Sequence, residues 1–109
     1  MRIFRALTKE SCVASMLRCM ENEDFLAAHR ELKRHGPDSP LPPPHALWRL
    51  GRVLLGRKQP RKALLPLEMF QELYPEHRDR PEVIRDLALA LKLSGQTKKA
   101  AAITNLANA

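Results

Sequence analysis

The sequence predicts an all-α fold, an α-solenoid of three stacked helix-turn-helix hairpins with about six helices. Proline and glycine residues divide the chain into six segments of helix length, and no segment shows the sustained alternation of β-branched residues that is typical of strands. The segments also repeat in pairs, because alanines near the start of three segments, Ala28, Ala63 and Ala100, are 35 and 37 positions apart. Periods of this length in helical pairs indicate a solenoid, since one hairpin cannot bury its own apolar face.

The three hairpins fit one domain, because 109 residues lie within the usual range of about 100–150 residues. We expect this single domain to span residues 1–109. Its hairpins are expected at residues 9–35, 45–74 and 81–107. Their helices are expected at residues 9–20, 24–35, 45–56, 61–74, 81–94 and 97–107.

The first hairpin begins with an apolar stripe at helical spacing, in which Cys12, Met16 and Cys19 fall on one face. Residues 1–10 are expected to form a basic lead-in to this helix, and they lack the long apolar run of a secretory signal. The second helix of the hairpin is expected to end at Gly36, which suits the C′ position.

The second hairpin starts after a run of prolines, in which a helix cannot continue. Pro44 suits the first turn of its first helix, and Leu47, Gly51 and Leu54 form the apolar face of that helix. Pro66 falls inside the second helix, where a proline removes a hydrogen bond and costs up to about 3 kcal/mol. That helix is therefore expected either to kink or to start two or three residues later.

The third hairpin has the clearest start and stop signals. Pro81 suits the first turn, and Asp79 with Glu82 resembles a capping box around it. Gly95 suits the C′ position at the end of the first helix. The apolar positions of that helix follow the spacing i, i+3, i+4 and i+7 at Ile84, Leu87, Ala88 and Leu91.

The central hairpin carries a recognisable pattern in the segment His45-Ala-Leu-Trp-Arg-Leu-Gly51, followed by Ala63, Phe70 and Tyr74-Pro75. This pattern resembles a tetratricopeptide repeat (TPR), in which a Leu-Gly pair, a packing alanine, a later core residue and a closing proline occupy these positions. The other hairpins are similar at fewer positions, namely Phe25 and Ala28 in the first, and Leu87, Ala88, Leu91, Gly95 and Ala100 in the third. In the first hairpin Met16 stands where a small residue is usual. The resemblance covers about residues 9–109.

The end of the predicted array departs from the family, which usually closes with a polar capping helix. The sequence ends at Ala109 without one, and its last helix contains few large apolar residues. Because terminal repeats need a polar outer face, we expect the chain to form a homo-oligomer or to require a partner.

The first helix of each predicted hairpin carries a second stripe of residues beside its apolar core stripe. Its members are Val13, Leu17, Met20, Trp48, Arg52, Leu55, Arg85, Leu89 and Lys92. The resemblance implies that these residues line a concave groove for a protein partner, an amphipathic helix or peptide that carries acidic residues. The alternative is that the stripe is core, packed between hairpins or in a homodimer. We expect Trp48, Arg52 and Arg85 to face one ligand, with Arg85 alongside Arg52.

The chain is strongly basic, with 19 Lys and Arg residues against 12 Asp and Glu residues and a net charge of +7. The cationic clusters are Arg30, Lys33 and Arg34; Arg49, Arg52, Arg57, Lys58, Arg61 and Lys62; and Lys98 and Lys99. They indicate a solvated face, an acidic protein partner, or contact with nucleic acid or an anionic membrane surface. Because only 5% of residues are aromatic, a base-stacking platform is disfavoured.

Catalytic and metal sites are not expected. The chain has no glycine-rich phosphate loop, and no Ser, His and Asp arrangement is evident. The pair Cys12 and Cys19, with His29 and His35, has the wrong spacing for zinc. The two cysteines lie seven apart on one predicted helix, about 10 Å, which is too far for a disulfide and favours the reducing cytoplasm. We therefore expect no enzyme activity, no cofactor and no metal.

The sequence as a whole favours a non-enzymatic protein-protein interaction module, an adaptor or a small chaperone that binds a partner peptide or helix in a groove. The alternative is a basic helical module on nucleic acid or an anionic membrane surface. Salt dependence distinguishes the two, because phosphate binding weakens steeply with salt.

Overall fold

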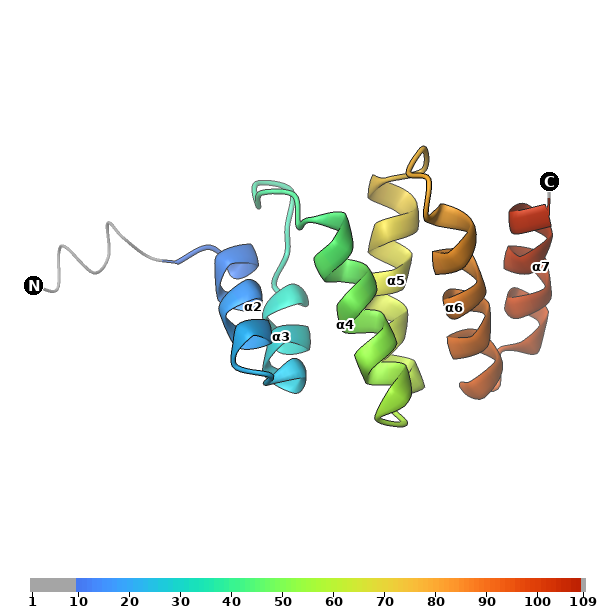
Figure 1. Ribbon diagram of the computed structural model, residues 1–109, viewed down its shortest axis with the longest axis horizontal. Coiled ribbons are helices and arrows are strands. Elements are labelled where there is room, and N and C mark those ends of the chain that lie inside the picture. The colour runs from blue at the N-terminus through green and yellow to red at the C-terminus, as the bar shows by residue number, and fades with distance from the viewer. Residues whose placement is uncertain (1–9, 109) are drawn as a thin grey trace, which may run out of the picture. The chain divides into compact units, whose positions relative to one another are not determined.

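The computed structural model describes the backbone of residues 10–108 and the side chains of residues 10–105. Within these residues it contains six helices and no strand, which confirms the predicted all-α fold (Figure 1). The helices are α2 (Cys12–Glu21), α3 (Phe25–Leu32), α4 (Pro44–Gly56), α5 (Pro60–Leu73), α6 (Arg80–Leu93) and α7 (Thr97–Asn108). The predicted basic lead-in lies, up to residue 9, outside the described residues.

The chain divides between Leu41 and Pro42 into two compact units. The first contains the hairpin of α2 and α3, and the second contains α4 to α7. The boundary falls in the proline-rich connection, where the backbone cannot continue a helix. The single domain over residues 1–109 stays a prediction.

Side-chain caps define the helix starts in the first unit. The Ala14 N–H donates to Ser11 Oγ at 3.1 Å, and the Ala27 N–H donates to Asp24 Oδ1 at 3.1 Å. These caps explain why α2 begins at Cys12, three residues later than predicted. The side chains buried in this unit include Val13, Met16, Met20, Phe25, Ala28 and Leu32.

The end of α3 differs from the prediction. The helix ends at Leu32, three residues early, so Gly36 is not its C′ residue and that prediction is wrong. A separate turn explains the difference, because the Gly36 N–H donates to Ser39 Oγ at 3.0 Å and a ring nitrogen of His35 lies 2.9 Å from the Pro40 carbonyl oxygen. These contacts hold the chain in a turn that a longer helix would break.

Prolines lie in the first turn of three of the four helices of the second unit, as expected from their fixed φ and missing N–H. Pro44 and Pro60 are the first residues of α4 and α5, and Pro81 is the second residue of α6. Gly95 follows the C-cap of α6 with φ +82°, which confirms its predicted C′ position. The start of α5 at Pro60 shows that the later start considered for this helix is wrong, and the helix continues through the buried Pro66.

The predicted capping box of α6 is wrong. Asp79 is the N-cap residue, but its side chain makes no capping hydrogen bond. Its N–H donates instead to Nδ1 of His77 at 3.1 Å, and its carboxylate lies 3.9 Å from the same nitrogen. The short turn before α6 therefore directs Asp79 toward His77 rather than toward the helix N-terminus.

The core of the second unit lies between α4, α5 and α6. Helix α6 packs against both α5 and α7 and makes a smaller contact with α4, while α4 packs against α5. Helices α4 and α5 approach closely at Gly51, because a Cβ atom at this position would lie 2.5 Å from Cγ and Cδ2 of Leu67. The side chains at the centre include Leu47, Leu50, Leu54, Ala63, Leu67, Phe70, Val83, Ile84 and Leu87.

Candidate interaction surface on α4 and α6

Three side chains from two helices form a polar and aromatic cluster in the second unit, which we call the Trp48 cluster (Trp48, Arg52 and Asp86). The indole Nε1–H of Trp48 donates to Oδ2 of Asp86 at 2.7 Å. The guanidinium carbon of Arg52 lies 5.5 Å from the Trp48 ring centroid, and its Nε lies 3.7 Å from Oδ2 of Asp86. The half-buried indole is therefore held by a charge-assisted hydrogen bond and a cation–π contact.

The helices explain how these residues meet. Trp48 and Arg52 are four apart on α4, so they share a face of that helix. Helix α6 contacts α4 and brings Asp86 to the same point. Asp86 was not among the residues selected from the sequence. One indication of its role was present in the sequence, because Asp86 directly follows Arg85. The residue that contacts Arg52 is therefore one position further along α6 than expected.

Arg52 and Arg85 form ion pairs with different carboxylates. The α6 residue that pairs with Arg52 is Asp86, whereas Nη2 of Arg85 lies 3.8 Å from Oε1 of Glu82 on its own helix. The side chains of Arg52 and Arg85 are 64% and 70% exposed. Such exposed ion pairs contribute about 0–1 kcal/mol, so both guanidiniums keep donors that an acidic ligand can use.

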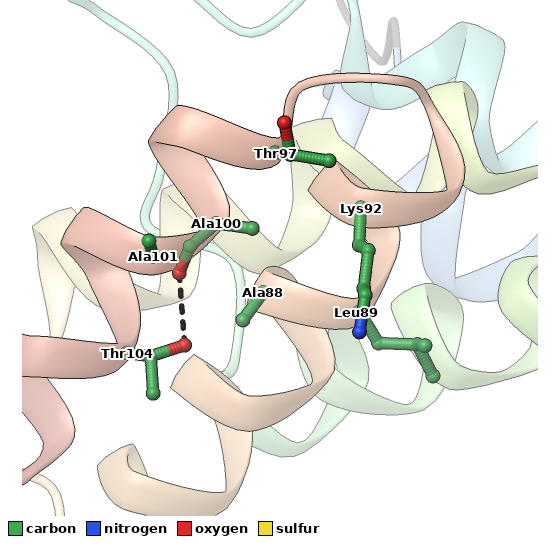
Figure 2. Close-up of a pocket in the computed structure, with 7 residues that line it drawn as sticks. All are labelled: Ala88, Leu89, Lys92, Thr97, Ala100, Ala101 and Thr104. Carbon is green, nitrogen blue, oxygen red and sulfur yellow. Dashed lines mark hydrogen bonds between the residues drawn. The ribbon is translucent and has the colours of Figure 1, made fainter.

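A hollow of about 380 Å³ between α6 and α7 continues this surface. We call it the α6–α7 hollow, and its lining residues are Ala88, Leu89, Lys92, Thr97, Ala100, Ala101 and Thr104 (Figure 2). Leu89 is 46% exposed and lies three residues after Asp86, on the same side of α6. The Thr104 hydroxyl donates to the Ala100 carbonyl oxygen at 2.8 Å, so its proton is already used within α7.

The lining of the hollow combines small apolar side chains with one cation. Figure 2 shows the methyl groups of Ala88 and Ala100 between the two helices, and Ala101 adds a third methyl group on the α7 side. The exposed Lys92 adds a positive charge at the edge. Leu55, seven residues after Trp48 on α4, is half-buried and extends the face along that helix. The structure thus places six of the nine predicted groove residues on α4 and α6.

The other three predicted groove residues belong to α2 in the first unit. Val13 and Met20 are buried, and Leu17 is half-buried. Burial of Val13 and Met20 fits the alternative interpretation, in which the stripe of this helix is core. We therefore restrict the candidate surface to α4, α6 and the α6–α7 hollow.

The candidate zinc ligands take part in other contacts. Cys12 Sγ lies 3.6 Å from Ser39 Oγ, and His29 is buried. Among residues 10–105, no group of three or more His, Cys, Asp or Glu side chains is placed to hold a metal ion. In the same part of the chain, no helix has the length and apolar character needed to cross a bilayer.

The turn between α4 and α5 carries part of the basic character of the chain. Lys58 and Arg61 line a hollow of about 260 Å³ with Leu93, whose side chain is also exposed. Lys58 has φ +60°, a conformation that fits the tight turn after α4. Two exposed cations thus lie beside an exposed apolar side chain at this turn.

Comparison with known proteins identifies no relative. No family model, no curated protein and no solved structure matches the chain. The interpretation of the Trp48 cluster and the α6–α7 hollow therefore depends on their geometry and chemistry.

Proposed function

We propose that this protein is a non-enzymatic interaction module, an adaptor or a small chaperone, that binds an amphipathic helix or peptide across α4 and α6. The observation that carries the proposal is the Trp48 cluster. Its aromatic side chain is half-buried and oriented by Asp86, and an exposed arginine lies against it. Tryptophan and arginine at such positions are the residues that most often anchor protein interfaces.

The chemistry of the surface supports a partner that is both apolar and acidic. Trp48 and the exposed Leu89 supply apolar contact, while Arg52, Arg85 and Lys92 supply positive charge. An amphipathic segment with apolar residues on one face and Asp or Glu beside them matches both features. The arginines can bind its carboxylates in bidentate geometry, because the guanidinium presents paired donors.

The resemblance to tetratricopeptide repeats supports the same surface. In that family the first helix of each hairpin lines the peptide groove, and α4 and α6 are the first helices of their hairpins. We also propose a cytoplasmic location. Its support is that Cys12 and Cys19 lie on one helix at a separation, about 10 Å, that does not permit a disulfide.

Binding of the natural partner tests this proposal. Affinity purification with the full chain, followed by mass spectrometry, identifies candidates whose affinity can then be measured. Arg52→Ala and Arg85→Ala should each weaken binding, by up to roughly thirtyfold for an interface anchor, and leave the melting temperature nearly unchanged. Arg30→Ala is the matched control, because Arg30 is an exposed arginine on α3. If both variants bind normally, or both unfold, the α4–α6 surface is not the binding site.

The alternative proposal is a basic module for nucleic acid or an anionic membrane surface. The hollow beside Lys58 and Arg61 favours it. Titration with duplex DNA and with anionic vesicles at increasing salt distinguishes the two proposals, because binding to phosphates weakens steeply with salt whereas apolar docking does not. If the alternative proposal holds, Arg61→Ala reduces the affinity for DNA or anionic vesicles, while Arg52→Ala reduces it only weakly.

A further inference from the structure

A second groove lies on the other side of α6, between α5 and α7, and it takes no part in the proposed function. We call it the α5–α7 groove. It has a volume of about 490 Å³ and is lined by Glu68, Gln71, Glu72, Leu87, Leu91, Lys99, Ala102 and Ile103. Leu87 and Leu91 are each two residues from Leu89, about 200° around the helix. The groove is therefore directed away from the Trp48 cluster.

The base of the groove is apolar. Leu87 and Leu91 are buried side chains of α6, and Ile103 from α7 is half-buried beside them. Ala102 is exposed on the α7 side and presents only a methyl group. A base of this kind accepts apolar side chains from an amphipathic segment.

The α5 wall of the groove is acidic. Glu68 and Glu72 are four residues apart on α5, so their carboxylates lie one turn apart on the same face. Desolvation in the groove raises the pKa of the exposed Glu68, the neighbouring Glu72 carboxylate raises it further, and Lys99 acts in the opposite direction. Among the residues that line the groove, two carboxylates thus face a single cation, Lys99.

This wall has the opposite sign to the chain as a whole, which carries +7. The net positive charge of the chain attracts anionic ligands at long range, whereas the two carboxylates of the α5–α7 groove attract cations at close range. A cationic group placed between Glu68 and Glu72 replaces repulsion with attraction at both carboxylates. An acidic segment in the same place adds to that repulsion.

We infer that the α5–α7 groove is a docking site for an amphipathic helix of a partner protein that carries lysine or arginine beside its apolar face. The apolar residues of the partner pack on Ile103 and Ala102, and its cations pair with Glu68 and Glu72. This site goes beyond the proposed function, because it selects the opposite charge on the opposite side of α6. With both surfaces occupied, the second unit holds an acidic and a basic segment at the same time, as an adaptor does.

Two synthetic helical peptides test this inference. One carries leucine on one face and lysine on the other, and the second replaces every lysine with glutamate. Each is labelled with a fluorophore, and its binding to the full chain is measured by fluorescence anisotropy. The lysine peptide should bind although the chain is cationic, and the double variant Glu68→Gln, Glu72→Gln should weaken it roughly tenfold.

The control must change the net charge equally. Glu21→Gln with Glu23→Gln provides this match, because both residues are exposed acids of the first unit. Equal effects of the two double variants, or no effect of either, would overturn the inference. If the groove variant loses helical dichroism, Ala102→Phe is the second test, since this exposed position lets the ring block the groove without disturbing the core. Failure of Ala102→Phe to reduce binding contradicts the inference as well.

The two proposed surfaces can be tested separately. Arg52→Ala should leave binding of the lysine peptide unchanged, because Arg52 lies on the α4–α6 surface. Loss of lysine-peptide binding in Arg52→Ala would show that the peptide docks there and would overturn the groove assignment. Loss of natural-partner binding in the same variant supports only the proposed function.

Discussion

The close contact between Gly51 and Leu67 makes an unusual prediction about a conservative substitution. In an ordinary helix, changing an interior glycine to alanine stabilises the helix by about 0.5–1 kcal/mol. At Gly51 we expect the opposite, because the new Cβ would lie 2.5 Å from both Cγ and Cδ2 of Leu67. Leu67 is fully buried, so its side chain cannot move out into solvent to relieve the contact.

The expected magnitude follows from two opposing terms. Inserting a methyl group into a packed core costs about 1–3 kcal/mol, and the contact here involves Cγ, which cannot move without the whole side chain. Subtracting the gain in helix propensity, at the midpoints of the two ranges, leaves a loss of about 1 kcal/mol in the free energy of unfolding. For a unit of this size each kcal/mol lowers the melting temperature by about 4–8 °C.

Urea unfolding followed by tryptophan fluorescence measures this loss. Trp48 is the one tryptophan of the chain and lies three residues before Gly51, so its emission reports on α4. Gly56→Ala is the matched control in the same helix, because no heavy atom lies within 4 Å of a Cβ at that position. We expect Gly56→Ala to be neutral or slightly stabilising.

A double-mutant cycle separates crowding from other effects. The Leu67→Ala background removes the three atoms nearest to the added methyl group at Gly51, so Gly51→Ala should become stabilising by up to about 1 kcal/mol. If Gly51→Ala is as stable as the parent protein, or if its effect is unchanged by Leu67→Ala, then α4 and α5 do not approach each other as described.

Three further predictions concern packing and hydrogen bonding. Ala63→Leu should cost about 1–3 kcal/mol by overpacking, because Ala63 is fully buried, and an unchanged thermal melt would show that it is not a packing alanine. The pKa of Glu31 is lowered below 4.5, first by the hydrogen bond from Ser15, so its contribution to stability is present above pH 4.5 and is lost as the pH falls through the lowered value. Glu31→Gln should therefore flatten the acid limb of a stability–pH curve, and an identical curve contradicts this. Trp48→Phe removes the donor to Asp86 and should cost about 1–2 kcal/mol in urea unfolding followed by circular dichroism, and no loss would mean that this bond contributes nothing to stability.

The sequence by itself determined the helices of this protein. Their positions depend on signals that act within a few residues, such as the prolines at the first turns of α4 and α6 and Gly95 at the end of α6. A proline at a helix start fixes φ and lacks only an N–H that would be unpaired anyway. Such signals operate independently of the rest of the fold, so five of the six helices start within one residue of the expected position.

Local signals failed where a more distant residue decided the conformation. The end of α3 moved from residue 35 to Leu32 because Ser39 and Pro40 hold the following turn. Asp79 and Glu82 have the spacing of a capping box, but the N–H of Asp79 donates to Nδ1 of His77. In both cases a hydrogen bond outside the helix replaced the expected helical or capping bond. The sequence pattern does not predict which of two competing hydrogen bonds is the more stable.

Only the tertiary structure decided which residues meet across helices. Periodicity places Trp48 and Arg52 on one face of α4, but it cannot say whether Arg85 or Asp86 lies opposite them. That choice depends on the rotation of α6 about its axis, which is set by how its side chains pack against α5 and α7. A rotation of 100° exchanges neighbouring residues on a helix. Packing thus turned the expected pair of arginines into the contact of Trp48 and Arg52 with Asp86.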